Sequence, residues 1–206
     1  ISINLKSLIN RVLFPFPMNT LILTEKPNVA EKIANFLGKA KKNQHEGIKY
    51  YEVEEGDNKI YVVSAVGHLY KLRQRTPIRD YPFFDVEWVE TFKNSKKSKY
   101  VEPYVRLIEE ISKGMDTFVN ACDYDIEGSV IGHNALLYGA KADISKSFRM
   151  KFSSLTKDEI ISAYENLNPP DYPMINAGLA RHVLDWYYGI NTSKAMTESL
   201  KKVSGR

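Results

Sequence analysis

Three carboxylates, Asp123, Asp125 and Glu127, alternate along five residues of the sequence, and Gly128 follows them at once. Carboxylates this close repel one another unless a cation or shared protons neutralise them. Mg²⁺ suits such a group, because it takes hard oxygen ligands, often only one or two carboxylates, and keeps waters or phosphates on its other positions. The same acids also fit a solvated acidic turn, so by themselves they leave both interpretations open.

The elements around these acids place them at the edge of a sheet. The apolar run at 118–122 predicts a buried strand, and the apolar positions from Val130 to Leu137 predict a helix directly after the acids. In open α/β sheets, ligands bind at the carboxyl ends of the strands. We therefore expect the strand to deliver the acids to a binding edge.

A second strand ends in the same way. The run MNTLILT at 18–24 predicts a buried strand that ends in Glu25 and Lys26, and a helix that Asn28 can cap follows. If this strand and the strand before Asp123 are neighbours in a parallel sheet, Glu25, Lys26 and the three acids form one site. Such a site suits a divalent metal together with an anionic group of a substrate.

A third predicted strand, at 59–65, is followed by Gly67-His68-Leu69. A lone histidine after a strand is more often structural than catalytic. The position of His68 after another strand end keeps it as a candidate for the same edge.

The whole pattern alternates strands with helices, which predicts an α/β fold with a largely parallel sheet. A polar stretch at 39–46 reads as a loop, and a Thr-x-x-Glu capping box at Thr156 opens a helix. After Pro169-Pro170 the pattern is helical almost to the end, with an interruption near Gly189. The other predicted elements are strands at 50–54 and 148–153 and a helix at 102–113.

Composition limits the class of protein. The 206 residues are 43% hydrophobic and 26% charged, which is ordinary for a soluble globular protein. No apolar run approaches the roughly 20 residues of a membrane span. The single cysteine, Cys122, excludes an internal disulfide and a cysteine-cluster zinc site within this chain. The net charge of +4 permits nucleic-acid binding without requiring it.

The predicted division of the chain has three parts. Residues 1–17 read as a leader or as an extension foreign to the fold, and 18–168 read as the α/β domain. Residues 169–206 read as the truncated start of a helical domain.

The combined motifs resemble the Toprim domain, which type IA and type II topoisomerases, bacterial-type primases and some nucleases share. The Toprim features are Glu25 at the end of the first strand and D-x-D-x-E-G at 123–128. Further segments resemble type IA DNA topoisomerases, in particular their topoisomerase III and archaeal branch. These segments are TEKPNVAEK at 24–32, AVGHL at 65–69, CDYDIEG at 122–128, RMKFSSLT at 149–156, NAGLARHVLDW at 176–186 and SGR at 204–206.

The resemblance implies a Rossmann-like, mostly parallel sheet flanked by helices and followed by part of a helical DNA-binding domain. It implies a Mg²⁺-dependent enzyme that cuts one DNA strand with a tyrosine, holds a 5′-phosphotyrosine link, passes another strand and reseals the gap. Such an enzyme relaxes negative supercoils or decatenates DNA and is cytoplasmic, at the nucleoid. The implied partners are DNA, chiefly single-stranded, and the remaining domains of the same polypeptide, with no membrane.

The resemblance also implies roles for single residues. Glu25 matches a catalytic glutamate that transfers a proton at the 3′ oxygen, and Lys26 matches a lysine that stabilises charge on the scissile phosphate. Asp123, Asp125 and Glu127 match the Mg²⁺-binding acids. The DNA-binding residues implied in the same way are Arg181, Asp185, Arg149 and His68.

Two departures from the family pattern bear on function. Many relatives have Pro-Asp-Arg between the acids, and in this chain Tyr124 and Ile126 fill those positions. The loss of that arginine removes one phosphate contact. None of the 13 tyrosines lies in the Pro-Arg-Thr-Asp context expected of the nucleophile, so we expect an N-terminal fragment that does not cleave DNA alone. The alternatives are a Mg²⁺-dependent Toprim nuclease, a non-catalytic nucleic-acid-binding module and the corresponding part of a reverse gyrase.

Overall fold

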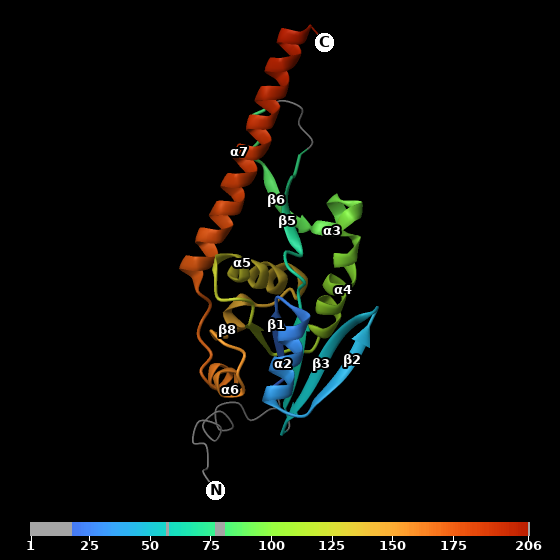
Figure 1. Cartoon of the computed structure of the whole chain (residues 1–206), viewed down its shortest axis with the longest axis vertical. Helices are drawn as coiled ribbons and strands as arrows, with labels where there is room; N and C mark the ends of the chain where they lie inside the picture. The colour runs from blue at the N-terminus through green and yellow to red at the C-terminus, as the bar shows by residue number, and fades with distance from the viewer. Residues whose placement is uncertain (1–17, 57, 77–80, 206) are drawn as a thin grey trace.

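A computed structural model describes residues 18–56, 58–76 and 81–205 of the chain (Figure 1). The leader predicted for residues 1–17 lies outside the described residues. At the centre is a six-stranded sheet with the strand order β2-β3-β4-β1-β7-β8. The strands are β1 (Thr20–Thr24), β2 (Ala40–His45), β3 (Ile48–Glu55), β4 (Asn58–Ser64), β7 (Thr117–Asn120) and β8 (Ser147–Arg149).

Four of these strands, β4, β1, β7 and β8, run parallel to one another, and β3 runs antiparallel to both β2 and β4. The predicted α/β class with a mostly parallel sheet is therefore confirmed. The parallel register of β1 and β7 pairs Leu23 with Asn120. Glu25 and Asp123 follow these residues closely, so both loops leave the sheet at the same edge, as the prediction required.

Helices cover both faces of the sheet (Figure 1). One hydrophobic core lies under α2 and α6, and the other lies under α4, α5 and the π-helical turn η2 that continues α5. Alternate residues of β1 point to opposite faces of the sheet. The fully buried Ile22 belongs to the core under α2 and α6, and the fully buried Leu21 and Leu23 belong to the core under α4 and α5. These elements are α2 (Pro27–Leu37), α4 (Glu102–Ile111), α5 (Ile126–Asn134), η2 (Ala135–Gly139) and α6 (Lys157–Glu165).

The predicted loop at 39–46 is wrong, because Ala40–His45 forms strand β2 and pairs antiparallel with β3. None of its residues is buried, so an edge strand of this kind lacks the apolar alternation that identifies a strand in a sequence. A hairpin of β5 (Tyr70–Gln74) and β6 (Val86–Glu90) was also not predicted. The short helical segments are α3 (Thr91–Asn94), η1 (Lys96–Val101) and η3 (Ile144–Lys146).

Both predicted helix caps differ in the structure. Helix α2 begins at Pro27, and Lys26, not Asn28, is its N-cap residue. Thr156 precedes α6 but makes no side-chain cap. The carboxylate of Glu159 instead accepts hydrogen bonds from the backbone N–H groups of Ser153 and Ser154. The carboxylate that a capping box would use as its acceptor, that of Glu159, is therefore bonded to the loop before α6.

The segment after Pro170 is a single helix, α7 (Tyr172–Ser204), of 33 residues. The interruption predicted near Gly189 is wrong, because an isolated glycine costs a helix only about 1 kcal/mol relative to alanine. Asp171 caps α7, since its Oδ1 accepts the N–H of Met174 at 3.2 Å. Figure 1 shows α7 beginning beside α5 and running away from the six-stranded sheet, beside the β5–β6 hairpin. None of the described helices, α7 included, has the length and apolar character that crossing a membrane requires.

Several contacts hold α7 against the rest of the chain, two of them at Gly178 and Asn191. Gly178 lets it approach α5 closely, since a Cβ at this position would lie 2.4 Å from Cγ2 of Val130. Further along, the side chain of Asn191 accepts the N–H of Phe83 at 2.6 Å and donates to the carbonyl of Phe83 at 3.0 Å. The first half of α7 is thus fixed relative to both the sheet and the hairpin.

We predict that Gly178→Ala lowers the free energy of unfolding by about 1–3 kcal/mol, because the added methyl group overpacks the α5–α7 contact. Gly189→Ala is the matched control on the same helix, with nothing within 4 Å of its Cβ position. It should raise the free energy of unfolding by up to about 1 kcal/mol through helix propensity. Urea denaturation followed by circular dichroism measures both values, and equal effects would contradict the close packing at Gly178.

Candidate functional site

The loops after β1 and β7 meet at one edge of the sheet. The ammonium of Lys26 lies 2.6 Å from Oδ2 of Asp123 and donates a hydrogen bond to it. This contact joins residues 97 positions apart in the chain. The structure thus brings together Glu25, Lys26 and Asp123, three of the residues that the sequence singled out.

Asp125 shapes the turn between β7 and α5. Its Oδ1 accepts the N–H of Gly128 at 2.7 Å, which makes it the N-cap of the helix. Its own N–H donates to the carbonyl of Asp123 at 2.9 Å. Gly128 is required in this turn, because a Cβ there would lie 2.1 Å from the same carbonyl oxygen. The spacing of the motif therefore has a structural reason as well as a chemical one.

Arg149, predicted to bind DNA, is 2% exposed and faces into the protein. Its Nη1 donates to the carbonyls of Asn120 and Cys122, each at 2.9 Å, and its Nη2 donates to the carbonyl of Asp123 at 2.7 Å. These are the last carbonyl of β7 and the carbonyls of the second and third residues after it. In this structure Arg149 positions the acidic turn and does not present its guanidinium at the surface.

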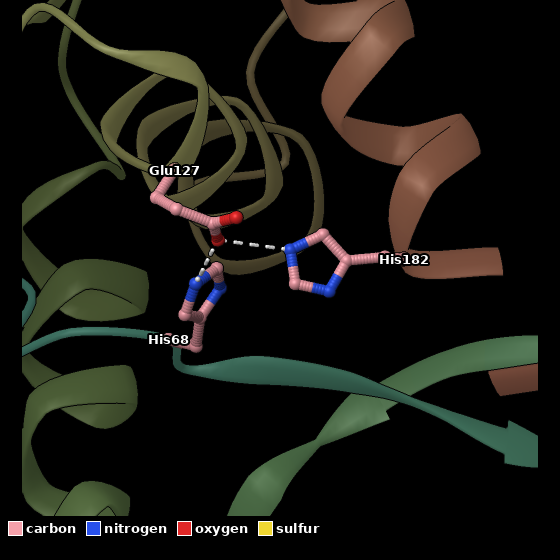
Figure 2. Close-up of side chains that lie close together, drawn as sticks. All are labelled: His68, Glu127 and His182. Atoms are coloured by element: carbon pink, nitrogen blue, oxygen red, sulfur yellow. Dashed lines mark hydrogen bonds and ion pairs between the residues drawn. The ribbon is translucent and has the colours of Figure 1, made fainter. Parts of the chain in front are cut away.

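Glu127 lies at the centre of a second group of side chains (Figure 2). Its Oε2 is 2.9 Å from Nε2 of His68 and 3.1 Å from Nε2 of His182. Nη1 of Arg181 lies 3.4 Å from Oε1, and Nε of Arg181 lies 3.7 Å from Oδ2 of Asp185. The loop after β4, the first turn of α5 and the middle of α7 thus meet at one carboxylate.

Sequence reasoning missed His182, although it had singled out its neighbour Arg181. The available signal was that the chain holds only four histidines and that one of them lies inside the matched helical segment. Nothing local in the sequence shows that His182 and His68 share a partner, because they are brought together only by the docking of α7.

The charges at this edge shift the protonation of the site. Burial raises the pKa of Glu25 above its ordinary value, and the charge of Asp123 raises it further, against the opposite effect of Lys26. The hydrogen bond to Asp123 raises the pKa of Lys26. Lys26 therefore stays charged, and Glu25 holds a proton more readily than an isolated glutamate.

In the group around Glu127, the pKa values of His68 and Glu127 are both lowered from their ordinary values. Burial lowers the pKa of His68, and the nearby His182 adds to this effect, while Glu127 opposes it. Burial alone would raise the pKa of Glu127, but the hydrogen bonds and charges of His182 and His68 together outweigh it, so that the pKa is lowered. Glu127 is therefore held as a carboxylate.

A cavity of about 760 Å³ opens beside the acids, between the start of α2 and the loop before α6. Lys26, Lys151 and the half-exposed ring of Tyr124 are among the side chains that line it. The ammonium of Lys151 lies 4.7 Å from the centre of the Tyr124 ring. Cations beside an exposed aromatic ring are the features with which proteins hold the phosphates and bases of single strands.

The donor set at the edge fits Mg²⁺. Asp123 and Asp125 are carboxylates with exposed surface, and Mg²⁺ is usually held by one or two carboxylates with water or phosphate completing the shell. The negative potential is visible in Glu25, whose pKa is raised by burial and then by Asp123, with smaller contributions from Asp125 and Glu127. Each of the three acids already has a partner, which is Lys26 at Asp123, the N–H of Gly128 at Asp125 and two imidazoles at Glu127.

Comparison with known proteins agrees with this geometry. Residues 20–155, more than half of the chain, match the family model of the Toprim domain, so the chain belongs to the Toprim family. The DNA topoisomerase 1 of Pyrococcus horikoshii is 45% identical over 189 residues, covering 90% of this chain and 28% of that protein. The DNA topoisomerase 1 of Methanocaldococcus jannaschii is 47% identical over 189 residues, covering 91% and 24%.

Reverse gyrase 1 of Aquifex aeolicus is also similar, with 28% identity over 193 residues that cover 88% of this chain and 16% of that protein. The predicted Toprim fold and the predicted resemblance to DNA topoisomerases are confirmed by these matches. The chain spans about a quarter of the length of the archaeal topoisomerases that it matches.

We predict that Arg149→Met lowers the free energy of unfolding by about 1–3 kcal/mol, since it takes the donor from the buried carbonyl of Cys122 and one of two donors from the carbonyls of Asn120 and Asp123. Arg181→Met is the matched control, because the side chain of Arg181 is 62% exposed, and it should change stability by less than about 0.5 kcal/mol. Urea denaturation of both variants measures the difference. A small effect of Arg149→Met would show that the turn holds its shape without the guanidinium.

Proposed function

We propose that this chain is the Toprim part of a type IA DNA topoisomerase and that its acidic edge holds the scissile phosphate during strand cleavage and religation. The observation that carries the proposal is the contact between Lys26 and Asp123, which joins the catalytic pair of one loop to the metal acids of the other. The similarity to proteins named DNA topoisomerase 1 over 90% of the chain supports it.

In this proposal Glu25 transfers the proton at the 3′ oxygen of the cleaved strand. Its raised pKa, caused first by burial and then by Asp123, suits a group that must gain and lose a proton near neutral pH. Lys26 stabilises the charge that develops on the phosphate. Its side chain is 52% exposed and ends at the edge of the cavity, where a phosphate can reach it.

Asp123 and Asp125 hold Mg²⁺, which supplies charge neutralisation and orients the DNA ends for religation. Arg149 keeps both acids in place through the carbonyls of the turn. His68 acts on Glu127 through its hydrogen bond and so fixes the third acid of the motif.

We propose that single-stranded DNA enters through the cavity beside the acids. Bases stack on Tyr124, and phosphates contact Lys26 and Lys151. Arg181 adds a backbone contact from α7, with Asp185 orienting it from the next turn of the helix. The nucleophilic tyrosine belongs to a Pro-Arg-Thr-Asp context that these 206 residues do not contain. The chain studied alone therefore binds DNA without cleaving it.

For the metal, we predict that Asp123→Asn/Asp125→Asn lowers Mg²⁺ affinity at least about tenfold, because both oxygen ligands lose their charge. Glu198→Gln, which changes an exposed acid near the end of α7, should leave the affinity unchanged. Isothermal titration calorimetry in the absence and presence of a single-stranded oligonucleotide measures this. If both variants bind Mg²⁺ equally well under both conditions, the acids do not form a metal site and are instead a solvated acidic turn.

For the DNA, we predict that Tyr124→Ala weakens binding of a single-stranded oligonucleotide by about 1–3 kcal/mol for each stacked base that is lost. Tyr100→Ala is the control, since Tyr100 is 63% exposed but does not line the cavity. Fluorescence anisotropy with a labelled oligonucleotide measures the affinities.

Denaturing gels of the same mixtures, with Mg²⁺ present, separate the alternatives. Intact oligonucleotide is the expected result. A protein–DNA adduct through a tyrosine would contradict the assignment of the nucleophile to a segment with the Pro-Arg-Thr-Asp context. Shortened free oligonucleotides, lost in Asp123→Asn/Asp125→Asn, would instead show a Mg²⁺-dependent nuclease.

A further inference from the structure

The side chains of His68, Glu127 and His182 converge from three separate elements (Figure 2). Their ligand atoms all lie within 4.8 Å of one another. Both imidazole Nε2 atoms point at the same carboxylate oxygen, at 2.9 and 3.1 Å. We propose that these three residues form a binding site for a zinc-class divalent cation, in which Glu127 serves with two histidines and not with Asp123 and Asp125 at the Mg²⁺ site.

The donor set selects the class of ion. Two imidazole nitrogens and one carboxylate oxygen suit Zn²⁺, Co²⁺ or Ni²⁺, whereas Mg²⁺ takes an octahedral shell of oxygen ligands. Three protein ligands with an open fourth position are the arrangement of catalytic and exchangeable zinc sites. Because the neutral imidazole is the ligand, the site loads in the pH range where both histidines are uncharged.

The distances fit such an ion with little rearrangement. Metal–ligand bonds of about 2.0–2.2 Å in a tetrahedral site put the ligand atoms about 3.3–3.5 Å apart. The nitrogen–oxygen distances at Glu127, 2.9 and 3.1 Å, are a few tenths of an ångström below this range, and the ligand atoms of the two histidines lie within 4.8 Å of each other. For binding, the proton on each Nε2 passes to solvent and Nδ1 takes one up from solvent, so that the Nε2 lone pair is free for the ion and both rings remain neutral.

The surroundings hold the rings in place. The rings of His68 and His182 pack edge to face with their centres 5.0 Å apart, and Trp88 packs edge to face on His182 at 5.7 Å. The side chains of His68, Glu127 and His182 are 32%, 40% and 29% exposed. The ligands are therefore ordered by packing but remain open to solvent on one side, which gives the ion a path of entry and room for a fourth ligand.

An ion at this position joins three elements that are distant in the chain. It links the loop after β4 to the start of α5 and to the middle of α7, alongside the Gly178 contact. The expected consequence is a more stable attachment of α7 to the Toprim core. This inference rests on the three side chains alone and does not depend on the proposed topoisomerase activity.

The test uses the whole 206-residue chain after treatment with a chelator. Zn²⁺ is titrated in competition with a chromogenic chelator, and Co²⁺ is followed by its visible absorption. The expected result is one ion per chain, with at least about a tenfold loss of affinity in both His68→Ala and His182→Ala. Mg²⁺ in large excess should not displace the ion.

His45→Ala is the matched control. Nε2 of His45 lies 3.2 Å from Oε2 of Glu110, which is a histidine–carboxylate pair on the surface with one imidazole instead of two. Its loss should leave Zn²⁺ affinity unchanged. Zinc binding that survives in both His68→Ala and His182→Ala, or that is lost equally in His45→Ala, would overturn the proposal.

Glu127→Gln is a further test in case the histidine variants fold poorly. Its amide oxygen can still accept a hydrogen bond, but the charge of the metal ligand is removed. Far-ultraviolet circular dichroism confirms the fold of each variant before titration. Zn²⁺ should raise the Tm of the wild-type chain by mass action and should raise it less in Glu127→Gln. No Zn²⁺-dependent rise in the wild-type Tm, together with no binding stronger than that of Mg²⁺, would also overturn the proposal.

Discussion

The acidic edge depends on one buried cation. The guanidinium of Arg149, at the end of β8, donates to the carbonyls of Asn120, Cys122 and Asp123. The carbonyls of Asn120 and Asp123 each accept a backbone N–H as well, from Met150 and Asp125. A buried carbonyl left without a donor costs about 1–3 kcal/mol, and the carbonyl of Cys122 is the one that depends most on the arginine. Arg149 therefore ties the turn that carries the three acids to the end of β8 at three points.

Much of this edge was predictable from the sequence because its main signals are local. A buried parallel strand reads as an unbroken apolar run, and the charged residues that end it mark the carboxyl edge. This identified β1 with Glu25 and β7 with Asp123, whereas the pairing of the two strands stayed a condition of the prediction, which the structure meets. The family motif added the roles of the acids, which spacing alone could not separate from a solvated turn.

What the sequence did not predict depends on contacts between distant segments. Strand β2 is polar because it lies at an edge, and the connection between β5 and β6 bonds to α7 through Asn191 and the backbone of Phe83. Arg149 looked like a surface cation, and only the tertiary structure shows that its donors face inward. His182 gave no local signal, because its partner Glu127 is 55 residues away and the two meet only when α7 docks.

The repulsion among the three acids is resolved within the chain by giving each a different partner. Asp123 is paired with Lys26, Asp125 accepts a backbone N–H at the N-terminus of α5, and Glu127 is held by two imidazoles and by Arg181. A helix N-terminus and a lysine each stabilise the carboxylate beside them, so the three acids do not share one neutralising group. A cation that binds Asp123 must compete with a charged lysine, whereas one that binds Glu127 meets two imidazole rings and, on the other carboxylate oxygen, the guanidinium of Arg181. The alternating spacing of the motif thus separates its acids into two environments, one suited to hard oxygen-seeking ions and the other to ions that accept nitrogen ligands.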